Sequence, residues 1–272
     1  MTTPRMFAAL AIALLFFAAA PAPQTVVIAT AEGRTAGAAA SELRGFLAHL
    51  NSQKDIRYTV QTYPSYDLAY DAFRNRKADL MLVGSVKYVQ AHHEIGAIPV
   101  VVEEPKWQES ALVVPAGSPI KTVDQLKGKN VAFGYEGSTT TDLLPRLLLS
   151  KHHMTVADLK KVEYSGPQQE LIVKAVTSGA VDAGALTTTV FNLHKDTLRA
   201  LDVSERVPGG TVVAHKDINP ATLQKIRGGM ISYKPAEGAA RERFGHGASV
   251  AEDADYNKVR FLCKVLFGKT YH

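Results

Sequence analysis

Short apolar segments alternate with stretches of helical periodicity along most of the chain. The clearest strand candidates are bounded by turn residues and lie at 25–30, 78–84, 98–104, 110–116, 130–135, 181–186 and 210–215. Between them, apolar residues recur at helical spacing, as in 38–51, 65–76, 168–179 and 220–233. This alternation predicts an α/β fold in which mostly parallel strands carry helices on both faces of a sheet.

Local signals predict where several helical segments begin. The segments "TVDQ" at 122–125 and "TVAD" at 155–158 are capping boxes, the second weaker than the first. Asn219 followed by Pro220 predicts an N-cap with proline at the first helical position. These signals agree with the periodicity and place helical turns between the predicted strands.

The length of the chain favours two bodies rather than one small core. It has 272 residues, and its sequence contains no internal repeat and no linker long enough to part independent domains. Two extended segments, 108–119 and 207–215, are predicted to cross between two lobes instead. Lobe 1 would then contain residues 25–110 and 211–272, and lobe 2 would contain residues 111–210.

The first 24 residues differ from the rest. Residues 6–20 are continuously apolar, and Arg5 is the only charged residue before Gln24. An apolar run of about 15 residues is short for a membrane span and typical of a signal-peptide core. We therefore predict a signal peptide at 1–24 and export to the periplasm. An uncleaved membrane anchor is the alternative.

Charge and cysteine content narrow the class of protein further. Cys263 is the only cysteine, so an intramolecular disulfide is excluded. The formal net charge is +5, or +4 without Arg5, and no basic tract concentrates it. A mild positive charge favours small anionic ligands and gives little support to nucleic-acid binding. We expect a monomer.

The stretch "FGYEGSTTTDLLPRLLL" at 133–149 joins a strand to a helix through glycines and hydroxyl residues. The first turn of a helix has unpaired backbone N–H groups and the positive end of the helix dipole. Ser138, Thr139 and Thr140 add hydroxyl donors there, at the strand end where open α/β sheets bind ligands. We predict that this turn holds an oxyanion. The alternative is that Ser138 or Thr141 is only an N-cap and the other hydroxyls are solvated.

Signatures of enzymes are absent from the sequence. No G-x-S-x-G elbow surrounds Ser138, and neither a P-loop nor a dinucleotide-binding glycine motif occurs. The pairs His92–His93 and His152–His153 lack carboxylates at metal-ligand spacing, and we interpret them as surface or packing residues. We therefore predict no enzymatic activity, no cofactor and no metal.

Segments spread in order over nearly the whole mature chain resemble one family of transport proteins. The segments are 63–92, 118–141, 165–186 and 253–266, and the second contains "GKNVAFGYEGSTTT", similar to a family motif that ends in S-T-S-G. On these segments the chain resembles the periplasmic substrate-binding proteins of phosphate, phosphite and phosphonate ABC transporters. The resemblance implies a type II periplasmic-binding-protein fold, in which two hinge crossovers join two mixed sheets and the ligand lies in the cleft between them.

The resemblance also implies roles for individual residues. Ser138, Thr139 and Thr140 take the places of the hydroxyl residues that hold the phosphonyl or phosphate oxygens. Tyr66 and Tyr88 take the places of tyrosines that close over the same group from lobe 1. Packing against Tyr70 is the alternative for Tyr66. The expected ligand-binding set is Ser138, Thr139, Thr140, Tyr88, Tyr66, Gln168, Thr187 and Ser85.

Departures from the family pattern bear on the ligand. Gln168 stands where relatives often carry a histidine, and Thr141 replaces the usual glycine. The second crossover, "VPGGT" at 207–211, has no acidic residue for the amine of an aminoalkyl phosphonate, and "TTT" at 187–189 offers hydroxyls instead. These departures favour phosphate, phosphite or a simple phosphonate, or else a ligand without phosphorus.

The resemblance implies a solute-binding protein that delivers a small oxyanion to an ABC permease by hinge closure. A ligand-sensing protein of the same fold that signals to a membrane receptor is an open alternative. A hydrolase with Ser138 as nucleophile is a third alternative, but the sequence supplies no general base for it.

Overall fold

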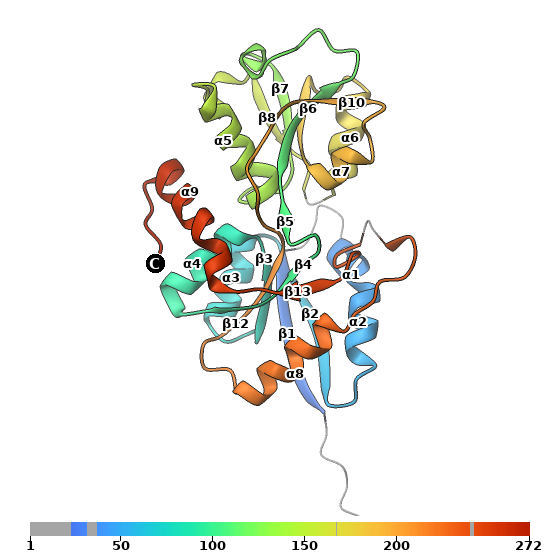
Figure 1. Cartoon of the computed structure of the whole chain (residues 1–272), viewed down its shortest axis with the longest axis vertical. Coiled ribbons are helices and arrows are strands. Elements are labelled where there is room, and N and C mark those ends of the chain that lie inside the picture. Colours follow the sequence, from blue (N-terminus) through green and yellow to red (C-terminus); the bar gives the residue numbers. More distant parts are fainter. Residues whose placement is uncertain (1–22, 32–36, 167, 240–241) are drawn as a thin grey trace, which may run out of the picture.

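The computed structural model describes residues 23–31, 37–166, 168–239 and 242–272. Its strands form two mixed sheets with a short two-stranded ladder between them (Figure 1). This is the α/β fold with two mixed sheets that the resemblance implies. The predicted signal peptide lies outside the described residues except at its end, where Gln24 already belongs to the first strand.

The first sheet has the strand order β13–β4–β12–β3–β1–β2. β1 runs parallel to β2 and β3, whereas β12 runs antiparallel to β3 and β4. The strands are β1 (Gln24–Ala31), β2 (Ile56–Tyr63), β3 (Leu80–Val83), β4 (Ile98–Glu103), β12 (Thr211–Ala214) and β13 (Ala248–Val250).

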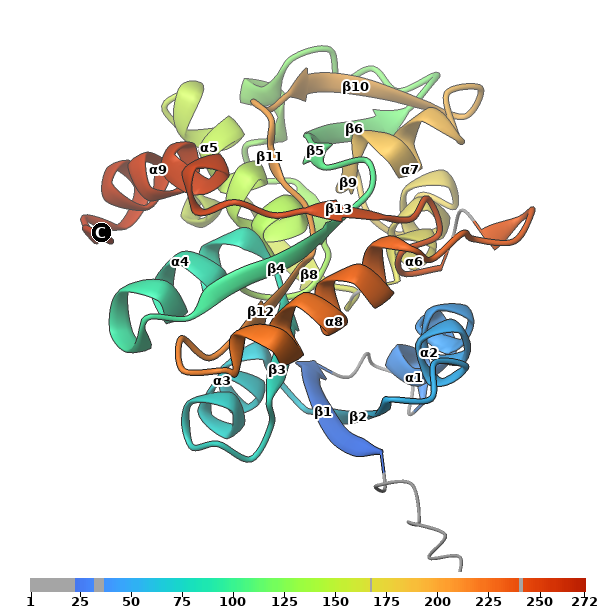
Figure 2. The same ribbon diagram turned by 60° about the horizontal axis from the view of Figure 1, so that its bottom comes forward.

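Helices cover both faces of the first sheet (Figure 2). Successive residues of a strand point to opposite faces, so in β3 Leu80 and Leu82 pack with α2 and α8, while Met81 and Val83 pack with α3, α4 and α9. The helices are α1 (Ala38–Glu42), α2 (Arg44–Asn51), α3 (Tyr66–Arg74), α4 (Ser85–Ile95), α8 (Pro220–Ile231) and α9 (Asn257–Phe267), and a 3₁₀ turn at Asp253–Tyr256 precedes α9.

The second sheet repeats this plan with the order β10–β6–β9–β7–β8. β7 runs parallel to β8 and β9, and β6 runs antiparallel to β9 and β10. The strands are β6 (Ser110–Pro115), β7 (Asn130–Phe133), β8 (Lys161–Tyr164), β9 (Ala183–Thr187) and β10 (Leu198–Val203). The helices are α5 (Leu144–Lys151), α6 (Gln169–Thr177) and α7 (Thr188–Asn192), and 3₁₀ turns occur at Val123–Leu126 and Val156–Asp158.

The chain passes between the sheets after β4 and again after β10. The two passages pair as β5 (Trp107–Gln108) and β11 (Val207–Pro208), which are antiparallel. The segments predicted as crossovers begin in or beside this ladder, but most of their length belongs to β6 and β12. Extended apolar residues satisfy their backbone groups by pairing within a sheet, so each crossing is shorter than predicted.

Every predicted strand is present, but β2, β8, β10 and β13 were not predicted. In β2 the apolar residues Ile56, Tyr58 and Val60 alternate with polar ones, which is the pattern of a half-buried edge strand rather than a continuous apolar run. The predicted helix at 38–51 is interrupted at Leu43. Both capping boxes are present, and Asn219 caps α8 as predicted.

None of the helices in the described part of the chain is long and apolar enough to cross a bilayer.

Candidate functional site

A cavity of about 430 Å³ lies between the two sheets. Its volume falls within the range of small-molecule sites, about 300–1,000 Å³. Residues from both sides line it. The second-sheet side contributes Ser138, Thr139, Thr140, Thr141, Gln168, Gln169, Glu170, Thr187 and Thr189, the first-sheet side contributes Glu42, Tyr66, Gly84, Glu103, Glu104, Glu242 and Arg243, and the crossovers contribute Gln108, Pro208 and Gly209.

The hydroxyl-rich turn after β7 forms one wall of this cavity. Ser138 is the N-cap of a π-helical turn at Thr139–Leu143, which continues into α5. The Ser138 Oγ accepts hydrogen bonds from Thr141 N at 3.4 Å and from Thr141 Oγ1 at 3.0 Å. The backbone N–H groups of Thr139 and Thr140 begin the helix and have no acceptor within the described part of the chain. Ser138 is therefore a helix cap and a cavity-lining residue at once.

The carboxylate of Asp142 stabilises this turn through hydrogen bonds. Its carboxylate is 2% exposed and accepts from Gly137 N at 2.8 Å, from Arg146 Nε at 2.8 Å and from Tyr164 OH at 3.1 Å. Gly137 has a φ of 79°, a conformation that suits glycine. Burial lowers the pKa of Arg146, but the hydrogen bond and charge of Asp142 outweigh burial and leave that pKa raised. The buried ion pair therefore fixes the loop that presents the hydroxyls.

The end of β9 brings a second group of polar side chains to the same wall. Thr187 is the N-cap of α7. The Oε1 of Gln169 accepts from Thr187 N at 2.7 Å and from Thr187 Oγ1 at 3.1 Å. Gln168, the neighbouring residue, lines the cavity at the start of α6. Gln168 and Thr187 thus both line the cavity, and Gln169 holds Thr187 in place through two hydrogen bonds.

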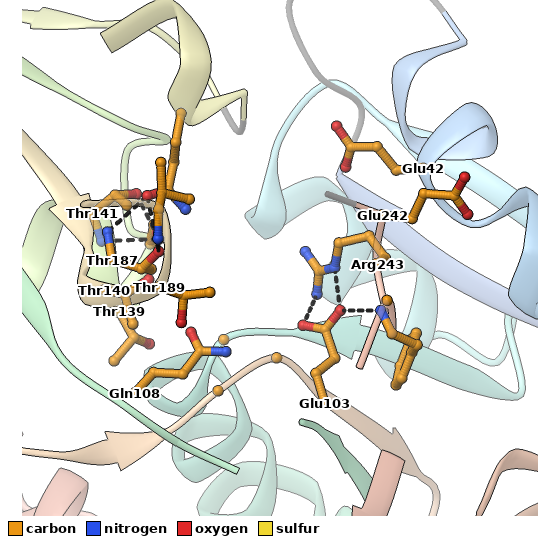
Figure 3. Close-up of a pocket in the computed structure, with 18 of the residues that line it drawn as sticks. Glu42, Glu103, Gln108, Thr139, Thr140, Thr141, Thr187, Thr189, Glu242 and Arg243 are labelled. Atoms are coloured by element: carbon orange, nitrogen blue, oxygen red, sulfur yellow. Dashed lines mark hydrogen bonds and ion pairs between the residues drawn. The ribbon is translucent and has the colours of Figure 1, made fainter. Parts of the chain in front are cut away.

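Charged residues form the opposite wall, as Figure 3 shows. Arg243 donates to both carboxylate oxygens of Glu103, from Nε at 2.6 Å and from Nη2 at 2.7 Å. Phe244 N donates to the same carboxylate at 3.1 Å. Burial acts to lower the pKa of Arg243, and the charge of Glu103 reverses this and raises it. Arg243 therefore keeps its positive charge at the cavity wall.

Tyr66 lies at the first-sheet edge of the cavity. Its ring meets that of Tyr135 edge-on with a centroid distance of 4.9 Å, and the Tyr135 hydroxyl donates to the carbonyl of Pro64. Burial raises the pKa of Tyr66, so its hydroxyl keeps its proton near neutral pH and can donate to an anion. The two rings bring the first and second sheets together at this edge.

Two predicted residues lie outside the cavity. The Ser85 hydroxyl is buried and donates to the carbonyl of Pro208, so it anchors the second crossover. Tyr88 is 0% exposed, its ring packs on Tyr256, and its hydroxyl donates to Asp253. In this structure α4 turns Tyr88 toward the C-terminal segment, because its aromatic ring is a core residue there. The family resemblance implied that Tyr88 closes over the ligand, but it could not give the direction of this side chain.

Sequence reasoning missed most of the charged wall. Five glutamates line the cavity, Glu42, Glu103, Glu104, Glu170 and Glu242. Glu103 and Glu104 are the last two residues of the predicted strand 98–104, which was a usable signal, whereas Glu242 and Arg243 come from a loop near the C-terminus that carries no motif. The absence of acids in the second crossover was a reason to disfavour an aminoalkyl phosphonate. These glutamates remove that reason, because the acids come from other parts of the chain.

Within the described residues, the cavity offers neither a cluster of metal ligands nor a base hydrogen-bonded to Ser138. In the described ranges no group of three histidine, cysteine, aspartate or glutamate residues could hold a metal ion. Among the described residues the Ser138 hydroxyl has Thr141 as its partner and no general base. The geometry is that of a binding site with hydroxyl and N–H donors on one wall and charged groups on the other.

Comparison with known proteins agrees with this geometry. Residues 32–256 match the family described as "ABC transporter, phosphonate, periplasmic substrate-binding protein". The probable ABC transporter phosphite binding protein PhnD1 of Prochlorococcus marinus (strain MIT 9301) is 29% identical over 156 residues, which are 54% of this chain and 52% of that protein. The matched stretch thus spans about half the length of this relative.

Two solved structures share the fold. PhnD1 from Prochlorococcus marinus in complex with methylphosphonate has a TM-score of 0.74 at 19% identity, covering 90% of this chain and 98% of that one. A binding protein component of an ABC phosphonate transporter from Pseudomonas aeruginosa has a TM-score of 0.68 at 18% identity, covering 88% of this chain and 85% of that one. Proteins of this family bind substrates for transport and are not enzymes. The match over residues 32–256, together with the two-sheet fold, shows that this chain belongs to the family of periplasmic substrate-binding proteins of phosphonate ABC transporters.

Proposed function

We propose that this protein is exported to the periplasm, binds a small phosphorus oxyanion as a monomer and delivers it to an ABC permease. The oxyanion would accept hydrogen bonds from the hydroxyls of Ser138, Thr139 and Thr140, from the N–H groups at the start of the π-helical turn, and from Tyr66. Gln168 and Thr187 would hold the other side of the ligand.

One observation supports this proposal above the others. The hydroxyl-rich helix start, whose Thr139 and Thr140 N–H groups have no acceptor among the described residues, faces a cavity between two bodies joined by two chain crossings. A helix N-terminus favours anions through its free donors and its dipole. Hydroxyl donors bind an oxyanion without a full countercharge, which suits a ligand that must be released again.

The size and charge of the cavity bear on the class of oxyanion. A volume of about 430 Å³ exceeds what a five-atom anion needs, so a phosphonate with an organic substituent fits the cavity better than phosphate does. The glutamates of the opposite wall disfavour a second negative group and favour a substituent that is neutral or carries an amine.

Hinge closure is the mechanism we propose for capture. Lobe 1 would comprise residues 25–110 and 211–272 and lobe 2 residues 111–210, with the β5–β11 ladder at the hinge. Two short crossings permit one body to rotate on the other, and closure excludes water from the hydrogen bonds that hold the ligand.

Calorimetric titration of the wild type and of Thr140→Val tests the proposal. Thr140 lines the cavity, and its hydroxyl has no hydrogen-bond partner in the described part of the chain, so valine removes one donor without breaking a structural bond. Phosphate, phosphite, methylphosphonate, aminoethylphosphonate and sulfate form the ligand panel. We expect Thr140→Val to weaken the tightest ligand about 10- to 100-fold.

The matched control is Thr59→Val, an exposed threonine on β2 that does not line the cavity. We expect it to leave every dissociation constant unchanged. If no anion of the panel binds the wild type or raises its melting temperature at millimolar concentration, the proposed function is wrong.

A further inference from the structure

The N-terminus of α4 receives its cap from the other sheet. The N-cap residue of this helix is Gly84, which has no side chain to cap with. The N–H of Val86, two positions into the helix region, instead donates to Thr139 Oγ1 at 3.1 Å, across 53 residues of sequence. An N-cap serine or threonine ordinarily accepts this same bond from within its own helix. Thr139 therefore supplies to α4 the bond that Gly84 cannot make.

The contact between Gly84 and Thr139 is fitted closely. A Cβ atom at residue 84 would lie 2.8 Å from Thr139 Oγ1 and 3.5 Å from Thr139 Cβ. The backbone of Gly84, with φ −76° and ψ 162°, is open to any residue. Residue 84 is therefore restricted to glycine because a side chain there would collide with Thr139, and not because of its backbone conformation.

Thr139 also lies where two regions meet. It is 4% exposed, and it lines the ligand cavity on one side. On the other side it borders an apolar contact between the second-sheet helix α5 and the C-terminal helix α9, which includes Leu144 and Leu262. A change in the separation of the two sheets would therefore alter the surroundings of its side chain.

We propose that Thr139 is a positioning residue that locks the hydroxyl turn onto α4 when the cleft is closed. Its oxygen accepts from Val86 N–H, and its own hydroxyl proton remains available to an acceptor in the cavity. The bond exists only while the two sheets are close, so it adds to the stability of the closed arrangement alone. This role goes beyond the proposed function, because it does not depend on which ligand binds.

The test measures the separation of the two bodies in the ligand-free protein, so its outcome is independent of the proposed function. Spin labels are placed at Lys77→Cys and Lys160→Cys, two exposed positions on opposite bodies, while the native Cys263 is buried. Double electron–electron resonance then gives the distribution of distances between the labels. Thr139→Val removes the acceptor and keeps the β-branched shape, and Thr139→Ser keeps the acceptor.

In the ligand-free protein we expect a larger fraction of short distances for the wild type and for Thr139→Ser than for Thr139→Val, whose distribution shifts to longer distances. The population of the closed form should fall about 3- to 30-fold, the range for losing one cap bond. Identical distributions for the wild type and Thr139→Val would overturn the proposal.

Gly84→Ala provides a second route that leaves Thr139 in place, and it keeps the test valid if Thr139→Val does not fold. The new Cβ displaces the Thr139 hydroxyl, so we expect the same shift to longer distances. Combined with Thr139→Ala, which removes both the acceptor and the atom that the new Cβ would meet, it should add nothing further, because both changes remove one shared contact. Shifts that add in the double variant would show that the two residues act separately, contrary to the proposal.

Discussion

Gly210 lies directly against the side chain of Glu103. A Cβ atom at residue 210 would stand 1.9 Å from Glu103 Oε2 and 2.4 Å from Nη2 of Arg243. The ion pair of Glu103 and Arg243 therefore packs directly against the backbone of Gly210, where a larger residue would not fit. Gly210 immediately precedes β12, so the end of the second crossover is in direct contact with the charged wall of the cavity.

The first prediction concerns the packing of the Glu103–Arg243 ion pair against Gly210. Gly210→Ala should lower the free energy of unfolding by about 2–4 kcal/mol, because the new methyl group forces apart a largely buried ion pair. Thermal unfolding should show a melting temperature lower by roughly 5–15 °C. Gly117→Ala is the matched control, since a Cβ there meets no atom within 4 Å. An equal loss in both variants would contradict this account.

A second prediction concerns the support beneath the hydroxyl turn. Asp142→Asn should destabilise the protein by about 2–3 kcal/mol and weaken ligand binding, because Arg146 loses its buried partner and Gly137 loses a charged acceptor. Denaturant unfolding and calorimetric titration measure the two effects. The control is Asp71→Asn, whose carboxylate is 51% exposed and pairs with Arg74. It should cost under about 1 kcal/mol, and a comparable cost at both sites would count against the positioning role of Asp142.

Stability should also depend on the protonation of His215. Burial lowers the pKa of this histidine more than the hydrogen bond to the carbonyl of Phe73 raises it, Arg76 lowers it further, and Asp217 and Asp79 oppose this. The folded state thus favours the neutral ring, and the unfolded state binds more protons below the ordinary pKa of about 6.5. The free energy of unfolding should therefore fall as the pH drops from about 6.5 toward the lower folded-state pKa.

The comparison of the wild type with His215→Gln isolates this contribution. Glutamine keeps a donor for the Phe73 carbonyl but does not titrate. We expect the stability advantage of the wild type to shrink as the pH falls from 7.5 to 5. A pH-independent difference for His215→Gln would mean that its titration does not contribute.

The last prediction concerns the charge of the ligand. Glu242 lines the cavity, is exposed, and has no ion-pair partner within the described residues. Glu242→Gln should strengthen the binding of methylphosphonate and weaken that of aminoethylphosphonate, each about two- to fivefold, since one negative charge leaves the wall. Competition titrations measure both affinities. Glu237→Gln, on the surface outside the cavity, serves as the control, and parallel changes for both ligands would argue against a charge effect.

Much of the fold could be predicted from the sequence because the relevant signals are local. The buried strand "LMLV" of β3 and the cap formed by Asn219 and Pro220 are each determined by a few neighbouring residues. The edge strand β2 was missed because its alternating residues are less apolar as a group than a central strand. Its strand character depends on pairing with β1, which lies outside its own sequence.

The candidate site divides in the same way. The turn containing Ser138 and Thr140 could be recognised, since a glycine-punctuated strand end followed by hydroxyl residues is a local pattern. The role of Arg243 could not be recognised, because its position depends on contacts with Glu103 and Gly210, which are distant from it in the sequence. Tyr88 illustrates the converse, since the family resemblance implied a ligand contact, but packing against Tyr256 decides the direction of its side chain.

By itself the sequence determined the alternation of strands and helices, the family, and the hydroxyl-rich turn at 138–140. The tertiary structure alone decided that Glu42, Glu103, Glu104, Glu242 and Arg243 lie across the cavity from that turn, and that Thr139 reaches across to cap α4. The physical reason is the distance along the sequence over which each kind of interaction acts. Backbone hydrogen bonds and caps form between near neighbours, whereas a cavity wall depends on how two separately folded sheets come to lie against each other.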